Sequence, residues 1–548
     1  MPALPKVLGR PGPEASFLSQ AQCWVEKGFL LNDIFVAVLF SLRFIFEENL
    51  SMKKIQIVIL LLVCCLLQAA PLAAQPIVDH PEKLAFKPLT YQPPKAKELR
   101  HMLQSGAVVF IAEDRELPLI NVSILVRTGD YLEPKEKAGL AAMVGALLRD
   151  GGTTTLTPDS LDEKIDFLAA NSGASISSTQ GNVSLNILSK DFDAGMALLV
   201  DMMKNPRFDE ARMKLYKERT LQNMQRRNDQ TAAIEGREWG RLMYGEDFFT
   251  NHLSTKQSLE SITRQELFDF HRKYYYPANF ILAVSGDFNK ADLLKRLDKH
   301  FAGWKSTRAA VPKVPRPAQA PKPGIYMVNK DVNQGRISIG HWGVERGNPD
   351  EFALAVMNDI LGGGGFTSRI TSKVRSDEGL AYSAGSNFGI GVYYPGVFRA
   401  AFQSKSPTCA HATKIVLDEI ARMRTEKVTD DELKTSVNSF IETFPLNFAT
   451  KAQVVGTFAA DEYTGRDPLY WETYRDNIRK VTADDVLRVA QKYLQPDKLV
   501  ILGVGNTKDI LAGYDKVPVK FTDFKLGEPK SIPLRDPLTL APLAESGK

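Results

Sequence analysis

Runs of apolar and polar residues along the chain predict an alternation of strands and helices. Residues 107–112 form a short apolar run, and residues 121–127 alternate between apolar and polar side chains, so each predicts a β-strand. A third strand is predicted at residues 280–284. Helices are predicted by apolar residues at helical spacing or by a capping residue at residues 139–149, from Thr157 onward, at residues 209–230 and at residues 231–243.

A proline-rich segment divides the chain into two halves that are similar to each other. Residues 309–323 contain five prolines, which predicts a stiff and exposed linker. Residues 262–286 align with residues 481–505 without a gap, and each stretch predicts a capped helix, a proline turn and a strand. Earlier stretches also correspond: residues 121–124 with 336–339, and residues 142–152 with 355–365. Self-similarity over so many positions predicts an internal duplication.

These elements predict an α+β fold of two duplicated domains that enclose a cavity between them. Each domain is expected to be a mostly antiparallel sheet with helices packed on one face. The expected boundaries are a first domain over residues 75–308, the linker over 309–323, a second domain over 324–525 and a tail over 526–548.

The composition fits a globular protein and excludes some classes of partner. The chain of 548 residues is 44% hydrophobic and 24% charged, which is ordinary for a folded protein and too long for one core. Its formal net charge of +5 is small for this length, and no basic block is interleaved with aromatic residues. We therefore expect no nucleic-acid partner.

A secretory signal peptide is predicted inside the chain, at residues 52–74. Met52 is followed by two lysines, an apolar run over residues 55–67 and a stretch of small residues ending at Ala74. Residues 1–51 are then an upstream extension from a start codon placed too early, or a genuine anchor around residues 29–46. We expect an exported protein, in the periplasm of a Gram-negative bacterium, with no stable membrane anchor after cleavage.

The cysteines leave no room for a disulfide in the mature chain. Cys23, Cys64 and Cys65 lie in the segment that is expected to be removed, so only Cys409 remains. A single cysteine also excludes a cysteine zinc cluster. On a strand, Cys409 and His411 would share a face, but no third metal ligand is close to them in sequence.

Residues 129–152 and 274–279 carry a resemblance to a known family. The first stretch contains Gly139-Leu-Ala and ends in Gly-Gly, and the second reads Tyr-Tyr-Tyr-Pro-Ala-Asn. Together with the duplication and the linker, they resemble the pitrilysin/insulinase zinc metallopeptidases in their short, two-domain bacterial form. The resemblance covers nearly all of the mature chain.

The resemblance implies that the zinc-binding residues of the family have been lost. Active members carry the motif H-x-x-E-H, in which two histidines bind zinc and the glutamate is the general base. The matching positions here are Ala142, Gly145 and Ala146, and the distal acidic ligand falls at Asn223 or its neighbour Gln222. Alanine and glycine offer no lone pair to a metal, so we expect this chain to bind no zinc by itself.

The second half retains a different feature of the same family. Arg375 and Tyr382 match an arginine and a tyrosine seven positions apart that, in the family, bind the substrate backbone and the oxyanion. A guanidinium and a phenol can both stabilise an oxygen that gains charge. Gly363 and Gly364, within a run of four glycines, would let the backbone approach a peptide closely.

The resemblance implies a non-catalytic subunit, inactive alone, that supplies Arg375 and Tyr382 to a partner. The partner would be a related H-x-x-E-H chain that binds zinc, and the heterodimer would hydrolyse peptides. The alternative is a catalytically dead peptide-binding or scaffold protein of the same fold. An independently active peptidase with an unrecognised site is the third reading.

Overall fold

The computed structural model describes residue 84, residues 90–304 and residues 311–544. Residues 89–548 form one compact unit, and the predicted signal peptide and upstream extension lie outside the described residues. Among the residues that are described, no helix is both long and apolar enough to cross a membrane.

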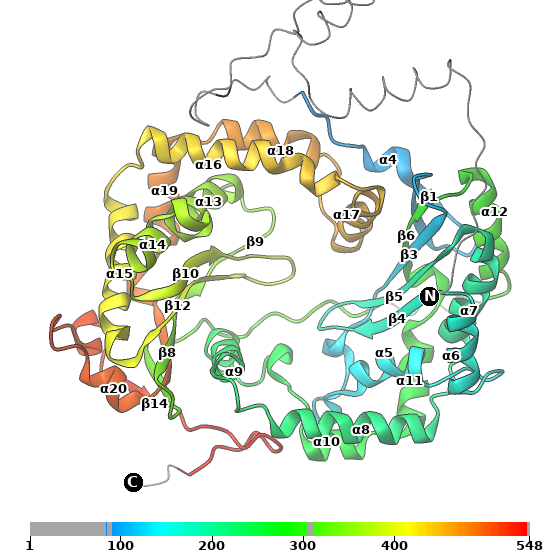
Figure 1. Ribbon diagram of the computed structural model, residues 1–548, viewed down its shortest axis with the longest axis horizontal. Helices are drawn as coiled ribbons and strands as arrows, with labels where there is room; N and C mark the ends of the chain where they lie inside the picture. The colour runs from blue at the N-terminus through cyan, green and yellow to red at the C-terminus, as the bar shows by residue number, and fades with distance from the viewer. Residues whose placement is uncertain (1–83, 85–89, 305–310, 545–548) are drawn as a thin grey trace, which may run out of the picture. The chain divides into compact units, whose positions relative to one another are not determined.

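The first half of the unit contains a six-stranded sheet in the order β1-β2-β6-β3-β5-β4 (Figure 1). Its strands are β1 (Arg100–Met102), β2 (Val108–Glu113), β3 (Leu119–Val126), β4 (Asn171–Ile176), β5 (Gly181–Leu188) and β6 (Phe280–Gly286). All neighbouring strands are antiparallel except β2 and β6, which are parallel. The strands predicted at residues 107–112, 121–127 and 280–284 are β2, β3 and β6.

One face of this sheet is covered by helices from the same half. They are α5 (Leu140–Asp150), α6 (Pro158–Phe167), α7 (Phe192–Lys204), α8 (Glu210–Gln225), α11 (Arg264–Tyr274) and α12 (Lys290–Phe301). Their apolar residues form one continuous core with every second residue of the strands, such as Val109 and Ile111 of β2. The side chain of Thr157 accepts a hydrogen bond from the Ser160 amide and caps α6, as its sequence predicts.

The second half contains another six-stranded sheet, in the order β10-β12-β8-β13-β7-β14. Its strands are β7 (Gly324–Asn329), β8 (Gln334–Trp342), β10 (Ala381–Phe388), β12 (Val397–Lys405), β13 (Val500–Gly505) and β14 (Lys530–Ser531). The helices that cover it are α13 (Glu351–Asn358), α15 (Cys409–Thr425), α16 (Asp430–Thr443), α18 (Tyr470–Arg479), α19 (Ala483–Tyr493) and α20 (Thr507–Ala512). Short elements complete the unit: α4 (Ala96–Leu99), α10 (Lys256–Ser261), α14 (Arg369–Thr371), and the paired strands β9 (Val344–Glu345) and β11 (Ile390–Gly391).

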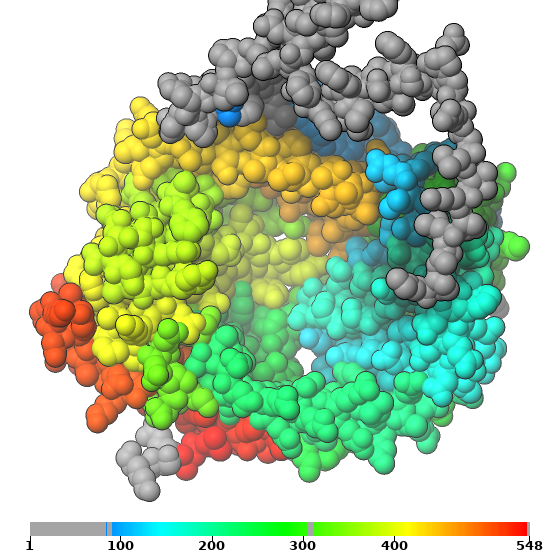
Figure 2. Space-filling model, in the orientation of Figure 1, coloured from blue at the N-terminus to red at the C-terminus, as the bar shows by residue number. Residues whose placement is uncertain are grey.

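The two sheets confirm the duplicated α+β fold. The order β2-β6-β3-β5-β4 of the first sheet recurs as β7-β13-β8-β12-β10 in the second. The aligned helices α11 and α19 both begin with a threonine capping box, at Thr263 and Thr482, and each leads through a proline turn into a central strand. Figure 2 shows a hollow between cyan residues of the first half and yellow residues of the second. A cavity between the two halves was expected at this place.

Each sheet is also covered on its other face by one helix from the opposite half. Helix α9 (Thr231–Tyr244) packs on β13 and β8 of the second sheet, and α17 (Lys451–Thr464) packs on β2, β3 and β6 of the first. The continuous apolar runs of the central strands require this cover, because a strand that is apolar on both faces must be buried on both. The sequence predicted helices on one face and did not predict this exchange.

Candidate substrate-binding site

The four positions that correspond to the zinc ligands and general base lie on α5 and α8. Ala142, Gly145 and Ala146 lie on α5, and Asn223 lies near the end of α8. Ala142 and Asn223 are exposed, whereas Gly145 is buried. Both predicted motif segments are therefore helical, and neither carries a histidine or an acidic residue at these four positions.

Gly145 also leaves no room for the glutamate of the motif. Helix α5 runs so close to β4 that a Cβ at Gly145 would lie 2.5 Å from the Ile176 amide nitrogen and 2.8 Å from the Ser175 carbonyl carbon. Real Cβ atoms do not approach backbone atoms so closely, so any side chain here requires a shift of α5 away from β4. The residues present at this place do not fit a zinc ion.

Cys409 and His411, the other pair considered as metal ligands, do not form a site either. Cys409 begins α15, so Cys409 and His411 lie on a helix, where positions two apart point in divergent directions; the shared face that a strand would give them is wrong. Burial raises the pKa of the Cys409 thiol to about 12. Within the described ranges, no group of three or more His, Cys, Asp or Glu residues is placed to hold a metal ion.

The glycine run of the second half lies against the edge strand β10. It spans a π-helical turn at Asp359–Gly363 and a 3₁₀ turn at Gly365–Thr367. A Cβ at Gly362 would lie 2.5 Å from the Ser386 amide nitrogen, so glycine is required there for the close approach to β10. Gly363 is exposed and Gly364 is half-buried.

The structure brings Arg375 and Tyr382 together beside this run. Arg375 lies in a π-helical turn at Ser372–Asp377, and Tyr382 lies near the start of β10. The guanidinium carbon of Arg375 is 4.8 Å from the centre of the Tyr382 ring, which is a cation–π contact. Tyr382 is 85% exposed, whereas Arg375 is half-buried.

A third side chain, Phe366, belongs to the same group and was not singled out from the sequence. Its ring centre is 4.4 Å from the guanidinium carbon of Arg375. The only sequence signal is its position directly after the glycine run, which does not by itself indicate a contact with Arg375. Among the described residues no ion pair involves Arg375, and the neighbouring Lys373 pairs with Asp377 at 2.7 Å instead.

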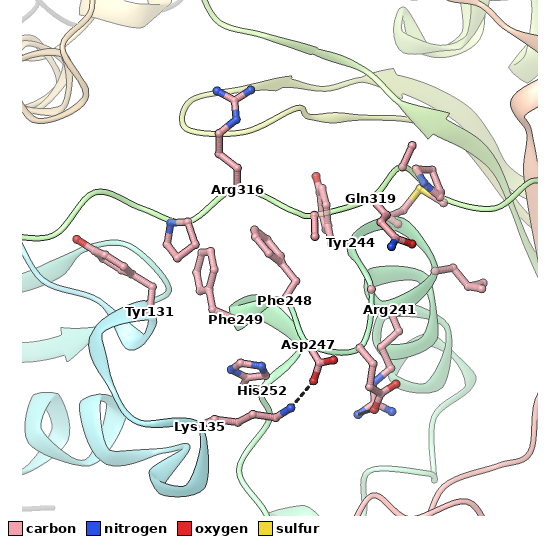
Figure 3. A pocket seen from close by; sticks show the side chains of 18 of the residues that line it. Tyr131, Lys135, Arg241, Tyr244, Asp247, Phe248, Phe249, His252, Arg316 and Gln319 are labelled. Carbon is pink, nitrogen blue, oxygen red and sulfur yellow. Dashed lines mark hydrogen bonds and ion pairs between the residues drawn. The ribbon is translucent and has the colours of Figure 1, made fainter.

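A separate pocket of about 660 Å³ lies between the loop after α9 and the proline-rich linker (Figure 3). Aromatic side chains of Tyr131, Tyr244, Phe248 and Phe249 line it, and the hydroxyl of Tyr131 donates to the Pro312 carbonyl of the linker at 2.9 Å. The pocket does not include Arg375 or Tyr382. It is therefore distinct from the group on the second half.

Two models of one peptidase family match the chain. The model described as Insulinase (Peptidase family M16) matches residues 108–238, which include α5, and the model described as Peptidase M16 inactive domain matches residues 261–440, which include Arg375 and Tyr382. The chain belongs to peptidase family M16. Together the two matches span both halves of the duplicated fold.

Curated relatives of this M16 chain carry different descriptions. An "Uncharacterized zinc protease" from Rickettsia felis is 23% identical over 394 residues, covering 71% of this chain and 93% of the relative. A "Non-peptidase homolog YmxG" from Helicobacter pylori is 23% identical over 415 residues, covering 74% of this chain and 93% of the relative. A probable mitochondrial-processing peptidase subunit beta from Arabidopsis thaliana is 22% identical over 441 residues, covering 76% and 79%.

Solved structures of the family have the same fold. A peptidase M16 inactive domain from Pseudomonas fluorescens has a TM-score of 0.67 and 24% identity, covering 74% of this chain and 97% of that chain. A protease from Helicobacter pylori has a TM-score of 0.65 and 20% identity, covering 76% and 100%. At these identities, the likeness concerns the fold and not the chemistry.

Proposed function

We propose that this M16 chain is the non-catalytic subunit of an exported metallopeptidase. In this proposal it supplies Arg375 and Tyr382 to a related partner chain that carries an intact H-x-x-E-H motif, and the heterodimer hydrolyses peptides. The observation that carries the proposal is the exposed stack of Arg375 on Tyr382 in a chain whose zinc-ligand positions hold Ala142, Gly145, Ala146 and Asn223.

The chemistry of the pair suits a peptide ligand. The Arg375 guanidinium donates several N–H groups in one plane, and the Tyr382 hydroxyl adds another donor. Both can bind a peptide carbonyl oxygen and stabilise the charge that it gains during attack on the amide. The partner's zinc would supply the activated water, and this chain's role is to bind and orient the peptide.

The predicted export signal gives the proposal its location. Residues 52–74 lie outside the described residues, so their role stays a prediction from sequence. We place the heterodimer in the periplasm, where it would act on peptides. One relative is described as a non-peptidase homolog and another as a peptidase subunit, and both descriptions favour a role other than that of a self-sufficient enzyme.

The experiment compares the chain starting at residue 75, a zinc-bearing M16 homologue from the same organism, and their mixture, each with and without a chelator. We expect chelator-sensitive peptide cleavage from the mixture that greatly exceeds the sum of the separate chains. The matched variants are Arg375→Ala in the site and Arg149→Ala, which removes an ion pair with Asp162 on the first half. Only Arg375→Ala should abolish the gain.

Two outcomes would contradict this proposal in different ways. A mixture that forms a complex without any gain in cleavage would favour the alternative of a peptide-binding or scaffold protein. Chelator-sensitive cleavage by this chain alone would mean that a metal is held by residues other than those at the motif.

A further inference from the structure

The Arg375 guanidinium contacts two exposed aromatic rings. Its carbon is 4.4 Å from the ring centre of Phe366 and 4.8 Å from that of Tyr382. The guanidinium is therefore in cation–π contact with two aromatic side chains at once.

The segment that carries Phe366 is held in place by its own hydrogen bonds. Gly365 has a positive φ of 61°, which glycine adopts without strain, and it starts the turn. The hydroxyl of Thr367 donates to the Gly364 carbonyl at 2.9 Å, and that of Ser368 donates to the Gly365 carbonyl at 2.7 Å. The next residue, Arg369, is buried and forms two hydrogen bonds with Glu432, at 2.6 and 2.8 Å.

Core packing does not account for the position of Phe366. The side chain is 66% exposed and is not part of the core of the second half. An exposed phenylalanine on an anchored turn, in contact with a guanidinium that has no ion pair in the described part of the chain, is better explained by that contact. Contact with both rings also limits the rotamers of Arg375.

We propose that Phe366 is a positioning residue for Arg375 and an apolar contact for the bound peptide. This inference rests on the proposed function, in which Arg375 and Tyr382 bind peptide. The guanidinium N–H groups lie in one plane and donate to a carbonyl oxygen within that plane, so the peptide backbone meets Arg375 edge-on. The solvent-facing side of the Phe366 ring then contacts the neighbouring side chain of the peptide, which favours peptides with an apolar or aromatic residue at that place.

The positioning role can be tested on the isolated chain, without any partner. In protein labelled with ¹⁵N-arginine, the Nε–H signal of Arg375 is assigned by its loss in Arg375→Lys. The ring currents of two flanking rings should shift this proton upfield. Phe366→Ala should move the signal toward that of a free arginine, and Phe366→Tyr should restore it; an unchanged signal in Phe366→Ala overturns the inference.

Peptide binding is measured on the same isolated chain with fluorescein-labelled peptides that carry Phe, Leu or Gly at the central position. Phe366→Ala should weaken binding of the Phe and Leu peptides by about threefold to tenfold, as expected for an exposed cation–π and apolar contact, and should remove their advantage over the Gly peptide. Phe366→Tyr should stay within about twofold of the parent chain. The matched control is Phe167→Ala, whose side chain is 90% exposed on the first half and which should leave binding unchanged.

The two proposals fail in distinguishable ways. If the mixture with a zinc-bearing partner cleaves nothing but peptide binding to this chain depends on Phe366, the subunit function is wrong and the role of Phe366 stands. If Phe366→Ala binds all three peptides as the parent chain does, or if the parent chain binds none of them, the role of Phe366 in peptide binding is wrong whatever the mixture does.

Discussion

The first and second halves share one strand order but border their edge strands differently. In the first half, the regular helix α5 runs along β4, with Gly145 in contact with the strand backbone. In the second half, β10 is bordered by π-helical and 3₁₀ turns from which Phe366 and Arg375 project beside Tyr382. The difference teaches that the duplicated scaffold is retained in both halves, while the contacts of Arg375 with Tyr382 and Phe366 belong to the second.

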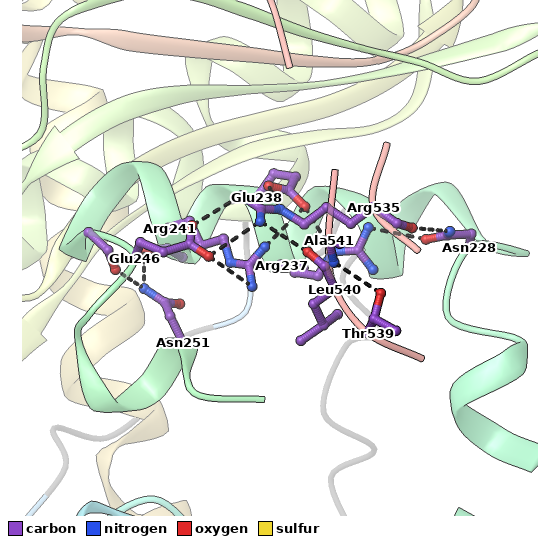
Figure 4. Close-up of polar contacts among 12 residues, drawn as sticks. Asn228, Arg237, Glu238, Arg241, Glu246, Asn251, Arg535, Thr539, Leu540 and Ala541 are labelled. Carbon is purple, nitrogen blue, oxygen red and sulfur yellow. Dashed lines mark hydrogen bonds and ion pairs between the residues drawn. The ribbon is translucent and has the colours of Figure 1, made fainter. Parts of the chain in front are cut away.

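The two helices that pack on the sheet of the opposite half, α17 and α9, also differ in their polar contacts. Helix α17 attaches to the first sheet through an apolar core that includes Phe458, with the Tyr463 hydroxyl donating to the Thr179 carbonyl at 2.5 Å. Helix α9 attaches to the second sheet through an apolar core and also through the buried Glu235, which binds Arg336 and Arg399, both at 2.8 Å. Figure 4 shows that the other side of α9 is also tied by charge, to the C-terminal tail.

That tail contact extends the ionic attachment of α9. The guanidinium of Arg535 lies 3.3 Å from the Glu238 carboxylate and 3.0 Å from Glu246, and the Asn228 amide donates to the Arg535 carbonyl at 2.7 Å. Charged groups therefore hold α9 from two directions in addition to its apolar core, whereas α17 combines its apolar core with one ion pair to the first sheet, between Glu462 and Arg100 at 2.8 Å. Substitutions on the two helices should separate these modes of attachment.

The largest expected effect is that of Glu235→Ala. It leaves Arg336, Arg399 and the buried Ser338 hydroxyl without their shared acceptor, and removing one partner of a buried ion pair costs about 3–5 kcal/mol of unfolding free energy. Tyr463→Phe on α17, which loses the hydroxyl shared between the Thr179 and Val126 carbonyls, should cost about 1 kcal/mol. Urea denaturation measures both, with the exposed Glu218→Ala of α8 as a control that should change little. Equal costs for Glu235→Ala and Tyr463→Phe would contradict the comparison.

The next effect concerns the contact between α5 and β4. Gly145→Ala should destabilise the chain by about 1–3 kcal/mol, because the added methyl group meets the Ile176 amide and overpacks the junction. Gly236→Ala in α9 is the matched control, since a Cβ there meets nothing within 4 Å and alanine favours a helix by about 1 kcal/mol. Opposite signs of the two changes in denaturation experiments support the close contact. A stabilising Gly145→Ala would show that α5 has space to accept a side chain.

One carboxyl group in each half should make the stability of the chain depend on pH, in opposite directions. Burial raises the pKa of Glu133 to about 7, so the folded state binds more protons than the unfolded state between about pH 4.5 and 7, and stability falls as pH rises through that window. In the second half, the hydrogen bond from Arg369 lowers the pKa of Glu432 to about 2, so its contribution is lost as pH falls from about 4.5 to 2.

Denaturation of the Glu133→Gln and Glu432→Gln variants over this pH range tests the assignment. Glu133→Gln should remove the loss of stability toward neutral pH, although it also weakens the two hydrogen bonds that Glu133 accepts from the Gly139 and Ala141 amides. Glu432→Gln should remove part of the loss in acid. Glu136→Gln, at an exposed neighbouring position, is the control and should keep both slopes. An unchanged neutral slope in Glu133→Gln would place its origin elsewhere.

The predictable parts of the fold are those that local pattern determines. The predicted helix at residues 139–149 is α5, and the aligned capped helices are α11 and α19, because periodic apolar residues and threonine caps act over a few positions. The exchange of α9 and α17 is not local. The stripe of Ile234, Trp239 and Met243 indicates that α9 is buried but does not say against which sheet.

The same limit applies to the site. The prediction that Ala142, Gly145 and Ala146 bind no metal follows from the family resemblance and residue type, whereas the contact of Gly145 with β4 depends on how closely two elements pack. Arg375 and Tyr382 could be paired from their spacing within the family resemblance. Phe366 could not, because its contact with Arg375 depends on the turn that the glycine run forms.

The smallest expected effect on stability is that of the residues proposed to bind peptide. Arg375→Ala and Tyr382→Ala should each change the unfolding free energy by less than about 0.5 kcal/mol, because Tyr382 is exposed and Arg375 has no ion pair in the described part of the chain. Gly362→Ala, a few residues away, meets the Ser386 amide at 2.5 Å and should be clearly destabilising. A stability cost of Arg375→Ala as large as that of Gly362→Ala would mean that the stack holds β10 in place. A negligible cost, combined with loss of peptide binding, would mean that the stack is maintained for a ligand.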